Sequence, residues 1–141
     1  MRLDRYTVRS QESLELAQKL ARDLGAPELA PEHLLAALLS DSGGTVAAVL
    51  EKLGVEREPL ASDAERAMSR LPRVQGGTLT MGEGLRAALE RAETAADRLK
   101  DEYVSVEHLL MALAESAEGA APALLARAGV TPDALLKALQ Q

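Results

Sequence analysis

The sequence predicts an all-α fold: two tandem four-helix repeats, eight helices in total, packed with pseudo-two-fold symmetry. The first observation is an internal repeat. Residues 7–66 align with residues 82–141 without a gap, at a constant offset of 75, and 17 of the 60 pairs are identical. The second is that the long segments carry apolar residues at helical spacing, and none alternates convincingly with period two. The third is a core of Leu, Ala and Val, since only 1% of residues are aromatic and Leu and Ala favour helices.

The first repeat divides into helices near 8–24, 31–40, 44–53 and 57–70. Thr7 fits the N-cap of the first helix, and Gly25 follows its apolar stripe. Pro31 fits the first turn of the second helix, Gly54 follows the third, and Pro72 stops the fourth. The stripe of the first helix consists of Leu14, Ala17, Leu20, Ala21 and Leu24.

The second repeat divides in the same way, into helices near 82–99, 106–115, 119–128 and 132–140. Ser105 and Thr131 are suitable N-caps, Pro132 fits a first turn, and Gly129 follows the seventh helix. The stripe of its first helix consists of Leu85, Ala88, Leu89, Ala92, Ala96 and Leu99.

We therefore expect one domain over residues 1–141, with repeat one at 1–70, a Pro- and Gly-containing linker at 71–81 and repeat two at 82–141. A lone repeat of about 65 residues would have a thin core, whereas two repeats can share one. The helical pattern continues to the last residue, which indicates a fragment of a longer protein.

Composition argues against several functions. The net charge of −6 disfavours nucleic acid as the main partner. The absence of Cys excludes disulfides, thiolate metal sites and Cys nucleophiles. No apolar run approaches the roughly 20 residues of a membrane span, and no hydrophobic signal region follows the N-terminus. We expect a soluble, cytoplasmic protein.

Catalytic and cofactor sites are also disfavoured. His33 and His108, the only histidines, are 75 residues apart, unlike the close spacing of zinc ligands. The favoured interpretation is that each packs or caps within its own repeat. No nucleophile and base are brought together by the sequence, and neither Gly43-Gly44 nor Gly76-Gly77 belongs to a phosphate loop. We expect no enzyme activity, no metal and no cofactor in this chain.

Glu32 and Glu107 open equivalent helices. Each carboxylate is either only stabilised by the dipole of its helix, or it forms an acidic corner that meets a cationic group of a partner. Thr7 is either only a cap or a hydroxyl presented beside Glu32, and Gly82 stands at its equivalent position.

A groove between the repeats could hold a hydrophobic client segment. Its candidate lining is Leu85, Leu89, Ala92, Ala96 and Leu110.

These residues together resemble the Clp N-terminal domain family. The doubled signature is Glu32-His33-Leu34-Leu35 with Glu107-His108-Leu109-Leu110. The segments 1–7 and 69–76, which contain Met1-Arg2-Leu3-Asp4-Arg5-Tyr6-Thr7 and Arg70-Leu71-Pro72-Arg73-Val74, resemble the version in ClpB disaggregases rather than ClpA or ClpC.

The resemblance implies a mobile substrate-recognition module of a hexameric AAA+ chaperone, which threads unfolded or aggregated clients with ATP, Mg and the Hsp70 system. The isolated domain is expected to be a monomer. Its implied client contacts are Thr7, Asp101 and Glu107, joined by Glu32, Leu89 and Leu110 as candidates. Gly82 argues against the phosphoarginine recognition of the ClpC branch, and Arg91, Ala95 and His108 depart from the apolar groove of ClpB. The alternative is an adaptor-docking or structural domain.

Overall fold

The computed structural model describes residues 3–140, which form eight α-helices, one 3-10 turn and two strands of two residues each. All eight predicted helices are confirmed, each bound within two residues. The arginine and methionine at the N-terminus and Gln141, on which parts of the sequence analysis rested, lie outside the described residues. The elements are the 3-10 turn Leu3–Arg5, α1 Val8–Asp23, β1 Glu28–Leu29, α2 Pro31–Ser40, α3 Thr45–Lys52, α4 Arg57–Ser69, β2 Thr80–Met81, α5 Glu83–Arg98, α6 Val106–Glu115, α7 Ala121–Arg127 and α8 Pro132–Leu139.

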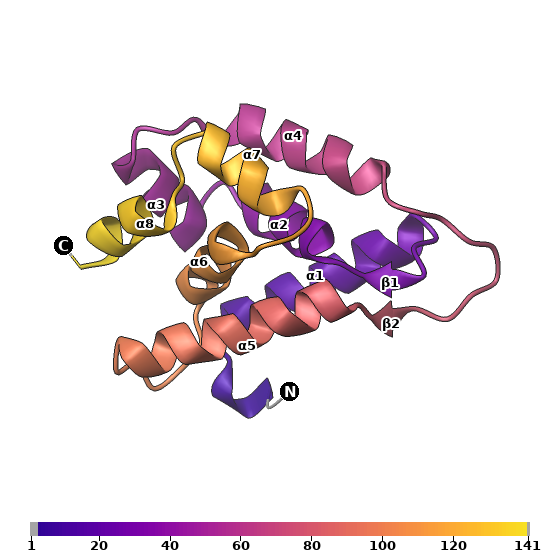
Figure 1. Cartoon of the computed structure of the whole chain (residues 1–141), viewed down its shortest axis with the longest axis horizontal. Coiled ribbons are helices and arrows are strands. Elements are labelled where there is room, and N and C mark those ends of the chain that lie inside the picture. Colours follow the sequence, from indigo (N-terminus) through magenta and orange to yellow (C-terminus); the bar gives the residue numbers. More distant parts are fainter. Residues whose placement is uncertain (1–2, 141) are drawn as a thin grey trace.

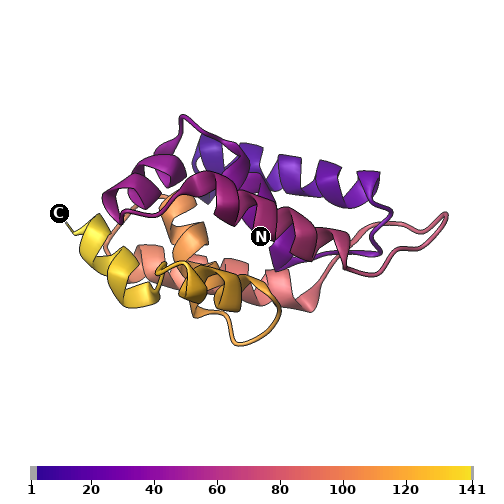
Figure 2. The same ribbon diagram turned by 90° about the horizontal axis from the view of Figure 1, so that it is seen from above.

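The second helix of each repeat forms the centre of the molecule. Nine of the ten residues of α2 and seven of the ten of α6 are buried. α2 packs against α1, α4 and α6, and α6 packs against α5, α7 and α8. Figure 2 shows the two repeats on opposite sides of this centre, and Figure 1 shows α4 beside α7. The prediction of one core shared by two repeats is therefore confirmed.

Two short parallel pairings join the repeats, and the sequence analysis did not predict them. Leu29 pairs with Met81 between β1 and β2, and Tyr6 pairs with Val104. The two pairs are equivalent at the offset of 75, because residue 6 corresponds to 81 and residue 29 to 104. The segment leading into each repeat is thus held by the other repeat. Pairings of one or two residues produce no period-two pattern, which explains why they were missed.

Most helix ends follow the predicted chemistry, and Thr131 caps α8 as expected. The Ser105 side chain, in contrast, makes no capping hydrogen bond to the backbone of α6. Oγ1 of Thr7 accepts a hydrogen bond from the N–H of Ser10 at 3.1 Å, which confirms the N-cap of α1. Gly25 ends α1 in the left-handed region, at φ 71°. Lys100 ends α5 at φ 61° in the equivalent place, the one non-glycine residue with positive φ among residues 3–140. A side chain in this region strains the backbone.

The loop between the repeats runs beside the end of α1 and forms an arm at the edge of the molecule (Figure 1). It is fixed there by the N–H of Val74, which donates to the carbonyl of Gly25 at 2.8 Å. Over residues 3–140, no single helix has both the length and the apolar character to cross a bilayer; α2 and α3 together reach that length but are bent by 84°.

Candidate functional site

Each histidine caps the helix on which it lies. Nδ1 of His33 accepts a hydrogen bond from the N–H of Ala30 at 2.9 Å, and Nδ1 of His108 accepts one from the N–H of Ser105 at 2.8 Å. Both rings are buried. These bonds satisfy backbone donors that a helix start otherwise leaves unpaired, and they confirm that each histidine caps within its own repeat.

The two rings differ at their other nitrogen. Because Nδ1 accepts a hydrogen bond in both, the neutral ring carries its proton on Nε2. Nε2 of His108 donates to Oδ2 of Asp101 at 2.8 Å, whereas Nε2 of His33 is buried without a partner among the described residues. The equivalent of Asp101 in repeat one is Ala26. Burial lowers the pKa of His33, and the nearby Glu32 carboxylate offsets this only in part.

Thr7 lies against the segment that leads into α6. Its N–H donates to the carbonyl of Val104 at 3.0 Å, and its hydroxyl donates to that of Ser10 at 2.9 Å. The Ser10 hydroxyl in turn donates to the same carbonyl at 2.9 Å. Thr7 therefore belongs with the start of α6, which carries Glu107. The alternative in which the Thr7 hydroxyl is presented beside Glu32 is wrong. Tyr6 pairs with Val104 of repeat two, and this pairing places Thr7 beside the start of α6.

Glu32 is built into the fold. Its side chain is buried, at 7% exposure, and Oε2 accepts a hydrogen bond from the N–H of Ala120 at 3.2 Å. Glu107 is half-buried and makes no such bond to the described residues. The two acidic corners already differ in sequence, by Thr7 against Gly82, and the structure shows that their carboxylates also differ in burial. We call the corner around Glu32 and Gly82 the closed corner, because its carboxylate is buried and hydrogen-bonded. We call the corner around Glu107 and Thr7 the open corner, because its carboxylate is free.

The closed corner is also tightly packed around two glycines, Gly82 and Gly119. A Cβ added at Gly82, the equivalent of Thr7, would lie 2.8 Å from the carbonyl of Leu29. A Cβ added at Gly119 would lie 3.3 Å from Oε2 of Glu32. Substitution by threonine at position 82 would require the backbone to shift.

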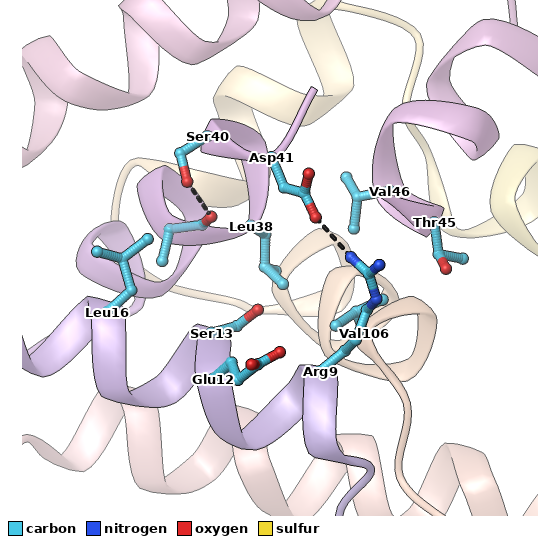
Figure 3. Close-up of a pocket in the computed structure, with 11 residues that line it drawn as sticks. Arg9, Glu12, Ser13, Leu16, Leu38, Ser40, Asp41, Thr45, Val46 and Val106 are labelled. Atoms are coloured by element: carbon cyan, nitrogen blue, oxygen red, sulfur yellow. Dashed lines mark hydrogen bonds and ion pairs between the residues drawn. The ribbon is translucent and has the colours of Figure 1, made fainter. Parts of the chain in front are cut away.

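A small pocket adjoins the open corner, between α1, the end of α2, the start of α3 and Val106 of α6 (Figure 3). Its volume is about 150 Å³. Figure 3 shows Arg9 and Asp41 joined across it by an ion pair of 2.7 Å. Both side chains are exposed, and such pairs contribute about 0–1 kcal/mol. A partner group can therefore displace this ion pair at little cost in stability.

Three of the six large apolar residues that are exposed among residues 3–140 lie on the segments that build the open corner, whereas one, Met81, is exposed on the segment that leads into repeat two. Val8 is 72% exposed, Tyr103 49% and Leu3 46%. Their equivalents in the other repeat are Glu83, Glu28 and Thr78. These residues were not predicted as part of a site, although an alignment of the two repeats shows the exchange of apolar for polar side chains at their positions.

The predicted hydrophobic groove is not open along its proposed lining. Leu89 and Leu110 are buried, so neither can contact a client in this conformation. The same holds for Leu85, Ala92 and Ala96. Their stripe faces the core because α5 and α6 pack against each other along it. A shallow groove of about 440 Å³ lies instead between α5, α6 and α8, and its apolar lining includes Ala95, Leu99, Met111 and Leu136.

The N-terminal segment is fastened to α5 by two side chains. Arg5 forms an ion pair with Asp97, and the Tyr6 hydroxyl donates to Oε2 of Glu93 at 2.8 Å. Burial and the Glu93 carboxylate raise the pKa of Tyr6 well above its usual value, so the phenol stays protonated. These contacts hold Thr7 and Val8 in place beside α6.

Fold and sequence together define the class of protein. Residues 5–125 match the Clp repeat (R) N-terminal domain family, and the chain belongs to it. Over the whole chain it is 33% identical to the chaperone protein ClpB of Porphyromonas gingivalis, and over 99% of the chain it is 38% identical to that of Rhodopirellula baltica. The chain spans 16% of the length of each of these relatives.

Solved structures show the same fold. The Hsp104 N-terminal domain from Candida albicans matches with a TM-score of 0.82 at 20% identity, covering 94% of this chain and 87% of that one. A ClpV N-domain solved in complex with a VipB peptide matches with a TM-score of 0.77 at 22% identity, covering 97% and 86%. The chain is thus an N-terminal domain of the Clp chaperone type, and it is similar in sequence to ClpB chaperones.

Proposed function

We propose that this chain is the client-recognition domain of a ClpB-type disaggregase, which binds unfolded or aggregated polypeptides and passes them to the AAA+ rings of the full-length protein. The observation that carries the proposal is the asymmetry of the two corners. The open corner combines Thr7, Asp101 and Glu107 with the exposed apolar residues Val8 and Tyr103. Exposed apolar side chains beside polar groups are typical of protein-interaction sites.

The comparisons support binding of a polypeptide in general terms. The ClpV N-domain, which shares the fold, was solved with a peptide bound. We extend the proposal to a module that carries no cofactor and catalyses no reaction itself, in the cytoplasm. ATP, Mg, the hexameric assembly and cooperation with the Hsp70 system then belong to the remainder of a longer protein.

The test is an NMR titration of the labelled domain with a reduced and alkylated, permanently unfolded protein. We expect shifts at Thr7, Val8 and Tyr103. Substituting Val8→Glu and Tyr103→Glu copies the acidic residues of the other repeat and should weaken binding by about fivefold or more. Leu136→Glu is the matched control, because Leu136 is also exposed but lies in the α5, α6 and α8 groove.

The outcomes separate the alternatives. Loss of binding in Leu136→Glu alone would move the client site to that groove and refute the open corner. Indifference to unfolded protein, combined with saturable binding of one folded partner, would favour an adaptor-docking domain.

A further inference from the structure

The carboxylate of Asp101 is held at one oxygen and open at the other. Oδ2 accepts the hydrogen bond from Nε2 of His108 at 2.8 Å, while the Asp101 side chain is 50% exposed. Within the part of the chain that the structure describes, Oδ1 has no hydrogen bond. One oxygen is therefore fixed by the protein, and the other faces solvent, where a donor group of a partner can reach it.

The bond to Asp101 is directional because the ring cannot turn freely. The N–H of Ser105 donates to Nδ1 of His108 at 2.8 Å, which places the ring proton on Nε2 and aims it at the carboxylate. The backbone of Asp101 is also fixed, since its N–H donates to the carbonyl of Ala96 at 2.8 Å. Lys100 supplies the left-handed turn immediately before it.

The same segment reaches the rest of the open corner. Ser105 directly follows Val104, whose carbonyl accepts bonds from the N–H of Thr7 and the hydroxyl of Ser10. A continuous path of hydrogen bonds and backbone thus links Asp101, through His108, to Thr7. Asp101, His108 and Thr7 are therefore held by one network, which does not include the Glu107 carboxylate.

Repeat one shows that the helix cap needs no acid. His33 caps α2 with nearly the same geometry, yet Ala26 leaves its Nε2 without an acceptor. A buried unpaired donor is destabilising by about 1–3 kcal/mol, and the fold tolerates it there. An acid at residue 101 is therefore not required to build this helix start, so its pairing in repeat two calls for another role.

We propose that His108 is a positioning residue, which orients the Asp101 carboxylate toward a hydrogen-bond donor or cationic group of a bound polypeptide. The inference rests on the proposed function of the open corner. It assigns the buried imidazole a task beyond capping α6 and confines that task to repeat two.

The experiment is a double-mutant cycle on binding of the unfolded protein. We expect Asp101→Ala to weaken the Kd by about tenfold and His108→Leu by about fivefold or more, since bonds to a charged group are strong. In the Asp101→Ala background, His108→Leu should add less than about twofold, because coupled residues are not additive. His33→Leu, which removes the equivalent cap, should leave the Kd within about twofold of wild type.

A conservative variant separates orientation from folding. In His108→Gln the amide oxygen can accept from Ser105, as in a capping box, and the amide N–H can donate to Asp101, so binding should recover to within about threefold of wild type. The Nε2 proton of His108 in the wild-type domain should also shift during the titration.

The outcomes are distinguishable. If Asp101→Ala binds normally, the proposed open-corner site itself fails. If Asp101→Ala weakens binding but His108→Leu does not, or if the two effects add, only the positioning role is overturned. A client that shifts the signals of residues around Asp101 and leaves the His108 Nε2 proton unmoved also overturns it.

Discussion

Replacing Lys100 by glycine should stabilise the domain. Lys100 takes φ 61° where repeat one has Gly25 at φ 71°, and the turns are otherwise alike. The N–H of residue 26 donates to Ala21 at 2.9 Å, and that of residue 101 donates to Ala96 at 2.8 Å. Relief of left-handed strain is worth about 1–2 kcal/mol, and the added freedom of the unfolded chain removes about 0.4–1 kcal/mol. The difference between these two effects is a net gain of about 0–1.6 kcal/mol, with a middle value of about 0.8 kcal/mol.

The matched variant is Gly25→Ala. A Cβ at residue 25 would lie 3.1 Å from the carbonyl of Val74 and would also sit at positive φ, so we expect a loss of about 1–2 kcal/mol. Equilibrium denaturation in urea, followed by circular dichroism, measures both changes in the free energy of unfolding. They are read from the urea midpoints, provided that the dependence of this free energy on urea concentration is the same in each variant. A less stable Lys100→Gly, or an unchanged Gly25→Ala, would refute the strain argument.

Three further predictions concern buried polar groups. Glu32→Ala should destabilise the domain by about 1–2 kcal/mol because it leaves the N–H of Ala120 unpaired, whereas Glu107→Ala should change stability by under about 0.5 kcal/mol; equal urea midpoints would contradict this. Tyr6→Phe should lower stability by about 1–2 kcal/mol through loss of its bond to α5, read from the thermal midpoint, and no change would show that this bond contributes nothing. The pKa of His33 is lowered in the folded state, so the unfolded chain takes up its proton first and stability falls as the pH drops below about 6.5. His33→Leu should flatten that dependence below about pH 6.5, and an identical slope would exclude His33 as its source.

The sequence predicted the helices well because their signals are local. Apolar spacing, Gly25 after a stripe, Pro31 in a first turn and Thr7 as a cap each act within a few residues, so the element bounds could be derived without tertiary information. The gap-free repeat then predicted the doubled architecture, because equivalent sequences bury equivalent faces.

The site could be predicted only in part. Glu32 and Glu107 are both followed by His-Leu-Leu. The contact from Ala120 of the other repeat, which distinguishes the buried carboxylate from the free one, could not be predicted from this signature. Leu89 and Leu110 carry the same apolar signal whether they line a core or a groove, since spacing defines a face of a helix and not what covers it. The bond between Asp101 and His108 was within reach of sequence reasoning, because both residues flank one helix start, but the missing partner of His33 became evident only in the structure.

The segment that leads into each repeat pairs with the other repeat. The two repeats are therefore arranged like the subunits of a two-fold dimer that have been joined into one chain. In a homodimer every substitution appears at both symmetric positions, so a change that opens one corner opens the other as well. Once the subunits share a single chain, each corner mutates alone. One corner can then keep Gly82 and a buried carboxylate for rigidity while the other accumulates exposed apolar residues. Covalent duplication thus separates the demands of folding from those of binding within the same architecture.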